Sequence, residues 1–210
     1  MFGFLRYLRE SVAQDTRPAV VTFGRMNPIT TGHDTLIKHV KNTADKFGSN
    51  GKPAYHEVIL SHSQDPKKNP LNIQQKLDYA RKFYPDTNFV GSTKEHPTLL
   101  HHLSRLYDRG HRDVHLVVGG DRVPEFSELV KKYNGVPGRH GHFNFDNFNV
   151  HSAGDRDPDA EGLEGMSASK MRLAAGAGDF DNFRKGIPEH VPDFEAKRLY
   201  NDVRKGMNIE

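Results

Sequence analysis

Short apolar segments alternate with amphipathic segments of about a dozen residues along the first half of this chain, and this alternation strongly limits its fold. The expected strands are residues 19–23, 57–61, 87–90 and 113–118, and the expected helices between them are residues 34–46, 72–83 and 98–109. Strands separated by helices of this length form a parallel sheet through right-handed crossovers. We therefore predict an α/β fold with a Rossmann-like parallel sheet of about five strands flanked by helices, the fifth strand being residues 148–151.

The two ends of the chain lie outside this alternation. Apolar side chains recur at helical spacing in the first residues, and the last residues have the pattern of a further helix. We divide the chain into an N-terminal amphipathic helix at residues 1–17, one α/β domain at residues 18–190, and a C-terminal helix, packed on that domain, at residues 191–210. Within the domain, the Gly- and His-rich residues 134–145 predict a mobile loop.

Composition excludes several classes of protein. The chain has 30 basic and 27 acidic residues among 210, a net charge of +3 that is too balanced to indicate a nucleic-acid partner. It has no cysteine, which excludes disulfides and thiolate metal sites and is typical of a reducing compartment. No segment approaches the roughly 20 apolar residues of a membrane span, and the first residues lack a signal-peptide pattern. We expect a cytoplasmic protein without membrane or nucleic-acid partners.

The segment Val20–His33 carries the strongest functional signal. An apolar strand passes through Gly24 and Pro28 to Gly32-His33, where a helix begins. A strand that turns onto a helix N-terminus can hold a phosphate, because unpaired N–H groups and the helix dipole both favour an anion. Thr30 adds a hydroxyl and His33 an imidazole, a combination that indicates chemistry on a nucleotide. The alternative is that His33 is a capping or packed side chain.

Other polar motifs follow the ends of the remaining expected strands. Lys67-Lys68 comes after the second strand, Gly119–Arg122 after the fourth, and Met166–Arg172 opens a late helix with two serines and an arginine. Because ligands of a parallel sheet bind beyond the carboxyl ends of its strands, we expect these motifs to converge with Arg25 and the Thr30 turn on one phosphate-binding site. Solvated loops and an ordinary capped helix are the alternatives.

Two further classes of site are not indicated. The chain has no Walker phosphate loop and no Gly-x-Gly-x-x-Gly fingerprint, which argues against a kinase or a dinucleotide dehydrogenase. His140-x-His142 lies in a glycine-rich segment without a third ligand at helical spacing, so we predict no protein metal site.

Thr30-x-Gly32-His33 and the later Met166-Ser167-Ala168-Ser169-x-x-Arg172 resemble the paired motifs of the nucleotidyltransferase superfamily, (His or Thr)-x-Gly-His and Ile-Ser-Ser-Thr-x-x-Arg. The resemblance covers most of the chain and implies the nucleotidyltransferase fold for residues 18–190. It implies three groups of site residues: His33, Thr30 and Arg172 as catalytic; Phe23, Gly24, Gly32, Gly120, Asp121, Ser167 and Ser169 as nucleotide-binding; and Arg25, Lys67, Lys68 and Arg122 as acceptor- or phosphate-binding.

The resemblance also implies a mechanism. In this superfamily the acceptor's phosphate attacks the α-phosphorus of a nucleoside triphosphate and expels pyrophosphate, without a covalent enzyme intermediate. His33 would stabilise the charge developing on the α-phosphate, while Ser167, Ser169 and Arg172 would hold the β- and γ-phosphates. The substrate would be ATP or CTP, and Mg²⁺ would be held mainly through its phosphates.

The acceptor stays open. Gly24-Arg25-x-x-Pro28 is similar to nicotinamide-mononucleotide adenylyltransferases, which we favour, whereas Pro28–His33 and the paired lysines are closer to phosphopantetheine adenylyltransferases. A cytidylyltransferase is a third alternative. A nucleotide-binding or assembly protein without turnover, and a relation to class I aminoacyl-tRNA synthetases, are alternatives of other kinds. Homo-oligomer formation and a cellular or viral source, with host cytoplasm as the location if viral, also stay open.

Overall fold

A five-stranded parallel sheet forms the centre of the computed structural model, which describes residues 14–154 and 166–209. The strand order is β3-β2-β1-β4-β5. The strands are β1 (Ala19–Gly24), β2 (Tyr55–Leu60), β3 (Phe89–Gly91), β4 (Asp113–Val118) and β5 (Asn147–Ser152). The predicted α/β fold with about five parallel strands is therefore confirmed.

Helices follow the strands in the expected alternation. They are α2 (Thr31–Lys46), α3 (Ile73–Phe83), α4 (Leu99–Asp108), α5 (Val123–Tyr133), α6 (Ala168–Gly176), α7 (Phe180–Lys185) and α8 (Asp193–Gly206), with a short 3₁₀ turn, η1 (Gly120–Arg122), before α5. Helix α2 begins three residues earlier than the sequence predicts. For α2 the reason is a cap, because the Thr30 side chain accepts a hydrogen bond at the helix start.

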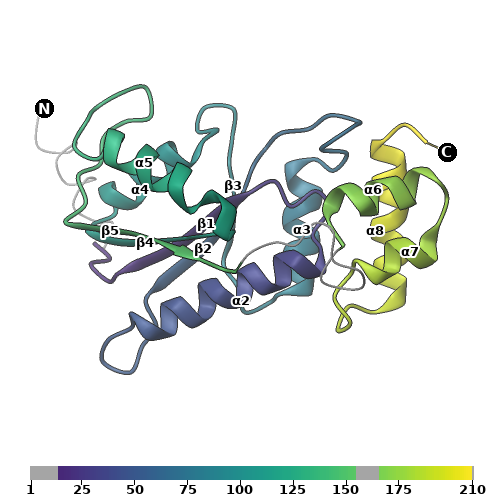
Figure 1. The fold of residues 1–210 in the computed structure, drawn as a ribbon, viewed down its shortest axis with the longest axis horizontal. Helices are drawn as coiled ribbons and strands as arrows, with labels where there is room; N and C mark the ends of the chain where they lie inside the picture. Colours follow the sequence, from purple (N-terminus) through teal and green to yellow (C-terminus); the bar gives the residue numbers. More distant parts are fainter. Residues whose placement is uncertain (1–13, 155–165, 210) are drawn as a thin grey trace, which may run out of the picture.

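The sheet is buried on both faces, with α2 on one face and α4 and α5 on the other (Figure 1). Along β1, Val20 packs into the core on the α2 side and Val21 into the core on the α4 side. This alternation explains why the strand is apolar at most positions, as strands covered by helices on both faces are. Among the described residues, no helix is both long and apolar enough to cross a bilayer.

The last three helices pack together at one end of the molecule, beside α3 (Figure 1). Tyr79 of α3 donates a hydrogen bond to Asp202 of α8 (2.6 Å), and Lys82 pairs with Glu195 (2.7 Å). A Cβ atom at Gly206 would lie 2.1 Å from the Pro70 carbonyl oxygen, so only glycine permits this approach of α8 to the β2–α3 connection. The division at residues 18–190 and 191–210 stays a prediction, and the helix expected in residues 1–17 falls almost wholly outside the described residues.

Residues 134–145 form a loop between α5 and β5, as the sequence predicts, but the packing of the loop argues against the predicted mobility. Phe143 is fully buried and Phe145 nearly so, both in the core on the α4 side of the sheet. The Asn134 side chain accepts the Phe145 N–H (2.9 Å) and donates to its carbonyl (3.1 Å). Two buried aromatic rings and these paired hydrogen bonds outweigh the flexibility that the glycines of the segment suggest.

Candidate active site

The turn between β1 and α2 places Thr30 and His33 against each other. The Thr30 N–H donates to His33 Nδ1 (3.0 Å), and the His33 N–H donates to Thr30 Oγ1 (3.4 Å), so the two residues form a reciprocal cap at the helix N-terminus. Both side chains are buried. Because Nδ1 accepts an N–H, the neutral imidazole carries its proton on Nε2, which makes Nε2–H a hydrogen-bond donor of the site.

The loop that precedes this turn is fixed by a buried asparagine. The Asn27 side chain donates to the Leu71 carbonyl (2.9 Å) and accepts the Leu71 N–H (3.0 Å). It therefore satisfies both backbone groups of Leu71, as the backbone of a neighbouring β-strand would. The Asn27 carbonyl in turn accepts a hydrogen bond from Arg172 of α6 (2.8 Å). Three segments that are distant in the sequence are therefore joined at one residue, which is 1% exposed.

The N-terminus of α6 carries the second motif. Ser167 caps the helix by accepting the Lys170 N–H (3.2 Å), and the Arg172 guanidinium donates to Ser169 Oγ (3.0 Å) as well as to Asn27. Burial and, to a smaller degree, the charge of Arg25 lower the pKa of Arg172. Both causes act against the positive charge, so an anion bound between Arg25 and Arg172 would be stabilised.

These two helix N-termini open onto one cavity of about 600 Å³. Its cationic, imidazole and hydroxyl side chains, called the basic lining below, are Arg25, Thr30, His33, Lys68, Arg122, Ser167, Ser169 and Arg172. The apolar side chains that β4, α4 and α5 contribute, called the apolar lining below, are Leu99, Val118, Phe126 and Leu129. Of the lining side chains that the structure describes, four are cationic by type and one, Asp121, is a carboxylate. The volume is within the ordinary range of roughly 300–1,000 Å³ for small-molecule sites. Its lining suits a ligand that has both a polyanionic part and an apolar part.

The structure brings most of the predicted site residues to this cavity. Besides the residues of the basic lining, Phe23, Gly24, Gly32 and Asp121 also lie on it. Gly120 and Lys67 do not. Gly120 begins the η1 turn, and its N–H donates to the Gly154 carbonyl (3.0 Å). Lys67 is exposed on the turn between Asp65 and Asn69, in the β2–α3 connection.

A tight turn explains why the neighbouring lysines differ. Asp65 accepts the backbone N–H groups of both Lys67 (3.0 Å) and Lys68 (2.7 Å), and its other oxygen accepts from the Asn69 side chain (2.5 Å). These hydrogen bonds lower the pKa of Asp65, the one from Lys68 most strongly. The turn brings Lys68 to the cavity and leaves Lys67 outside it.

The apolar lining was not predicted. Leu99 comes from the start of α4, whereas Phe126 and Leu129 come from α5 and lie three residues apart on one helix face. The Arg122 guanidinium lies over the Phe126 ring, 5.1 Å from its centroid. The spacing of Phe126 and Leu129 indicates an apolar helix face, but nothing in the sequence distinguishes a cavity-facing side chain from a core one.

Within the described ranges, no group of three His, Asp or Glu side chains is arranged to hold a metal ion. His140, considered above as a ligand, packs edge-on against Tyr133 and lies 5.5 Å from the Phe143 ring. Among the described residues, Asp121 is the only carboxylate on the cavity, and it could at most supplement a metal ion that a triphosphate brings with it.

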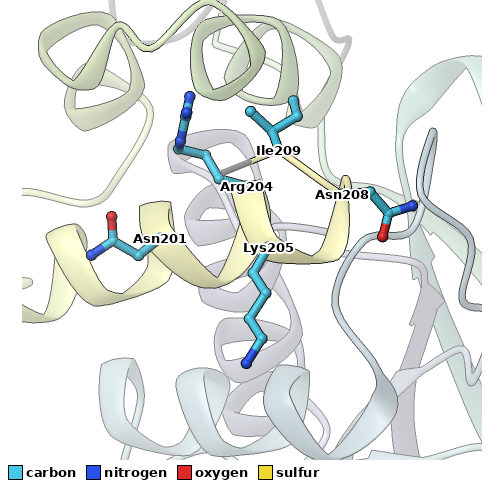
Figure 2. A pocket seen from close by; sticks show the side chains of 5 residues that line it. All are labelled: Asn201, Arg204, Lys205, Asn208 and Ile209. Carbon is cyan, nitrogen blue, oxygen red and sulfur yellow. The ribbon is translucent and has the colours of Figure 1, made fainter.

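A second hollow of about 470 Å³ lies at the end of α8, far from these motifs in the sequence. Asn201, Arg204, Lys205, Asn208 and Ile209 line it. Figure 2 shows that their side chains do not converge, because Lys205 points away from Arg204 and Ile209. Arg204 donates to the Ala175 carbonyl (2.6 Å), where it caps the end of α6. This hollow has a structural explanation and no evident site chemistry.

No protein-family model and no curated protein matches the sequence. Solved structures do match the fold. One, from Vibrio parahaemolyticus, is described provisionally as a nicotinate-nucleotide adenylyltransferase; it is 13% identical, has a TM-score of 0.51, and is matched over 88% of this chain and 99% of its own. Another is the Plasmodium falciparum nicotinic acid mononucleotide adenylyltransferase complexed with NaAD. It is 15% identical, has a TM-score of 0.54, and is matched over 88% of this chain and 98% of its own.

The chain has the fold of these adenylyltransferases. The fold that the paired motifs imply is therefore confirmed. At 13% and 15% identity, a shared fold does not establish a shared substrate or activity.

Proposed function

We propose that the protein is a nucleotidyltransferase that transfers AMP from ATP to a pyridine mononucleotide, with release of pyrophosphate. The observation that carries the proposal is the convergence of two capped helix N-termini and four cationic side chains, together with Thr30 and His33, on one cavity. The fold shared with two nicotinate-nucleotide adenylyltransferases supports the pyridine mononucleotide, nicotinate or nicotinamide, as acceptor.

The chemistry would be one displacement at the α-phosphorus. An oxygen of the acceptor's phosphate forms a bond to that phosphorus while the bond to the β-phosphate oxygen breaks, and the electron pair leaves with pyrophosphate. Such a reaction needs positioning and charge stabilisation rather than a protein nucleophile. His33 would donate from Nε2–H to the α-phosphate, where negative charge develops in the transition state.

The remaining residues would hold the two substrates. The N-terminal N–H groups of α6, with Ser167, Ser169 and Arg172, would bind the β- and γ-phosphates. Arg25 and Lys68 would bind the acceptor's phosphate, and Asp121 would contact the nucleotide. The apolar lining would take a base or ring of a substrate. Mg²⁺ would enter on the triphosphate and neutralise part of its charge. This fits a cavity whose described lining has one carboxylate and four cationic side chains.

A pyrophosphate-release screen tests the proposal. Purified protein is incubated with Mg²⁺ and either ATP or CTP, together with nicotinate mononucleotide, nicotinamide mononucleotide or phosphopantetheine. We expect release with ATP and a pyridine mononucleotide. Release only with phosphopantetheine or only with CTP would replace the acceptor or the nucleotide, while ATP binding without release from any pair would contradict an enzyme and favour a nucleotide-binding protein.

A cytoplasmic location and the absence of nucleic-acid partners belong to the same proposal. They are supported by a cysteine-free chain with nearly balanced charge and by a cavity suited to small anions. Binding of RNA at moderate salt would contradict the second point.

A further inference from the structure

Lys76 is a buried lysine on α3 that the proposed chemistry does not use. It is 3% exposed and lies on the buried face of the helix with Tyr79, Ala80 and Phe83. Spacing of this kind predicts an apolar side chain, so a lysine here is unexpected. Its Nζ donates to two backbone carbonyls, those of Arg25 (3.0 Å) and Ser61.

The two carbonyls belong to adjacent strand ends at the cavity. Gly24 of β1 and Leu60 of β2 are partners in the sheet, and Arg25 and Ser61 are the residues that follow them. The Ser61 N–H also donates to the Gly24 carbonyl (2.9 Å), which continues the pairing by one residue. The Lys76 ammonium therefore bridges β1 and β2 at the point where β1 passes into the cavity-lining loop.

That loop needs support from outside. Met26, next to Arg25, has φ = +41°. This left-handed conformation is unfavourable for any residue that has a Cβ atom. Asn27 is held by its two hydrogen bonds to Leu71, just ahead of α3. Hydrogen bonds from α3 and the residues just before it therefore hold the loop on both sides of Met26. Lys76 binds the Arg25 carbonyl, and Leu71 pairs with the Asn27 side chain.

Lys76 is also costly to bury. Its partners are neutral carbonyls, and burial followed by the charge of Arg25 lowers the pKa of Lys76 to about 8. A buried ammonium without a carboxylate partner lowers stability relative to an apolar residue of similar size. A purely structural position would be filled better by methionine or leucine, so the lysine calls for a functional reason.

We propose that Lys76 is a positioning residue of the site, which fixes the Arg25–Asn27 loop through the Arg25 carbonyl and adds a positive charge behind the phosphate-binding cavity. The proposal rests on the proposed function, because it takes the ligand to be a nucleoside triphosphate. Its direct consequence is that Lys76 strengthens ATP binding and turnover without touching the substrate.

Three variants test it: Lys76→Met, Lys76→Arg and Lys82→Met. Lys82 lies on the same helix but is exposed and pairs with Glu195, so its variant controls for loss of one positive charge from α3. The measurements are the Kd of ATP by calorimetry, kcat and KM from pyrophosphate release, and thermal unfolding. We expect Lys76→Met to weaken ATP binding and kcat/KM by at least about tenfold, Lys76→Arg to restore most of the loss, and Lys82→Met to match the wild type.

The pH dependence provides a readout that a structural role would not give. Above pH 7.5 the phosphates of ATP are fully ionised. Arg25 from the loop is the charged group, among the described residues, whose field acts on Lys76. As the pH rises through about 8, Lys76 loses its proton and its charge, so the ATP affinity of the wild type should fall several-fold by pH 9.5. The fall should be absent from Lys76→Met, which has no charge to lose, and from Lys76→Arg, whose guanidinium stays protonated to pH 9.5.

The outcomes separate the two proposals. If the wild type binds ATP but releases no pyrophosphate with any acceptor, the proposed function is wrong and Lys76 is judged on ATP affinity alone. If the wild type turns over and Lys76→Met binds ATP and reacts as well as Lys82→Met, the inference about Lys76 is overturned. Should Lys76→Met fail to fold, a flat affinity between pH 7.5 and 9.5 in the wild type overturns it equally, as does failure of the wild type to bind ATP.

Discussion

The basic lining and the apolar lining of the cavity are built in different ways. The basic lining consists mainly of helix caps and of side chains tied to backbone atoms, such as the Thr30–His33 pair and the Arg172–Asn27 contact. The apolar lining consists of two half-buried side chains on one face of α5, Phe126 and Leu129, and two buried ones, Leu99 of α4 and Val118 of β4. Hydrogen bonds hold the polar atoms of the basic lining in fixed positions, whereas the apolar lining provides a shape and an apolar surface for the ligand. We expect the first to govern turnover and the second to govern which ligand is bound.

The largest effect is expected at His33. Substitution His33→Ala removes the Nε2–H donor near the α-phosphate and should lower kcat about 100- to 1,000-fold, in line with the loss of one transition-state donor. The change leaves Thr30 Oγ1 able to accept the residue 33 N–H, so the cap and the fold should survive. Pyrophosphate release measures kcat, and thermal unfolding checks the fold. Turnover near the wild-type level would contradict the proposed mechanism.

The next largest effect is expected at Arg172. Its guanidinium reaches the Asn27 carbonyl and Ser169 Oγ at once, a fork that a lysine ammonium cannot reproduce. Substitution Arg172→Lys should raise the KM for ATP about 10- to 100-fold. Lys170→Met is the matched control, because Lys170 is exposed on the same helix and does not line the cavity. Because Arg172→Lys keeps the positive charge, a KM for ATP no higher than that of Lys170→Met would contradict a role for the guanidinium fork.

The apolar lining should behave differently. Substitution Leu129→Ala removes apolar contact and should weaken binding of a nucleoside-bearing ligand about tenfold, with no change in the affinity for inorganic pyrophosphate. Leu173→Ala, at a 74% exposed residue of α6 outside the cavity, is the control. Calorimetry with ATP, the mononucleotide and pyrophosphate measures each affinity. Weaker pyrophosphate binding by Leu129→Ala would remove the distinction between the two linings.

The smallest effect is expected at Asp65. Substitution Asp65→Ala removes the acceptor that orders the turn before Lys68, so the KM for the acceptor should rise about two- to fivefold while kcat is unchanged. Asp78→Ala, at an exposed residue of α3, is the control. Because the pKa of Asp65 is lowered, the same loss should appear in the wild type only in acid, when Asp65 becomes protonated. A change in kcat would instead place Asp65 close to the reacting groups.

The difference between the two linings also explains what the sequence predicts. Thr30, His33, Ser167 and Arg172 could be predicted because phosphate binding requires certain residue types at fixed spacing around a helix N-terminus. The alternation of strands and helices likewise predicts the sheet and the edge at which these motifs meet.

Other residues could not be predicted, because their roles depend on tertiary contacts. Phe126 and Leu129 look like core residues until the packing of α5 is known. Asn27 and Lys76 act through backbone atoms 44 and 51 residues away, and no local pattern encodes such a contact. The mobility predicted for the loop at residues 134–145 fails for the same reason, since its glycines suggest mobility while Phe143 and Phe145 bury their rings in the core.

The central claim is direct transfer of AMP to the acceptor's phosphate. Phosphorus-31 NMR of the wild type with Mg²⁺, ATP and nicotinate mononucleotide tests it most directly. The account predicts that pyrophosphate and a dinucleotide with a new diphosphate bridge appear in equal amounts as ATP disappears. Tight ATP binding with unchanged ATP and mononucleotide signals would contradict it.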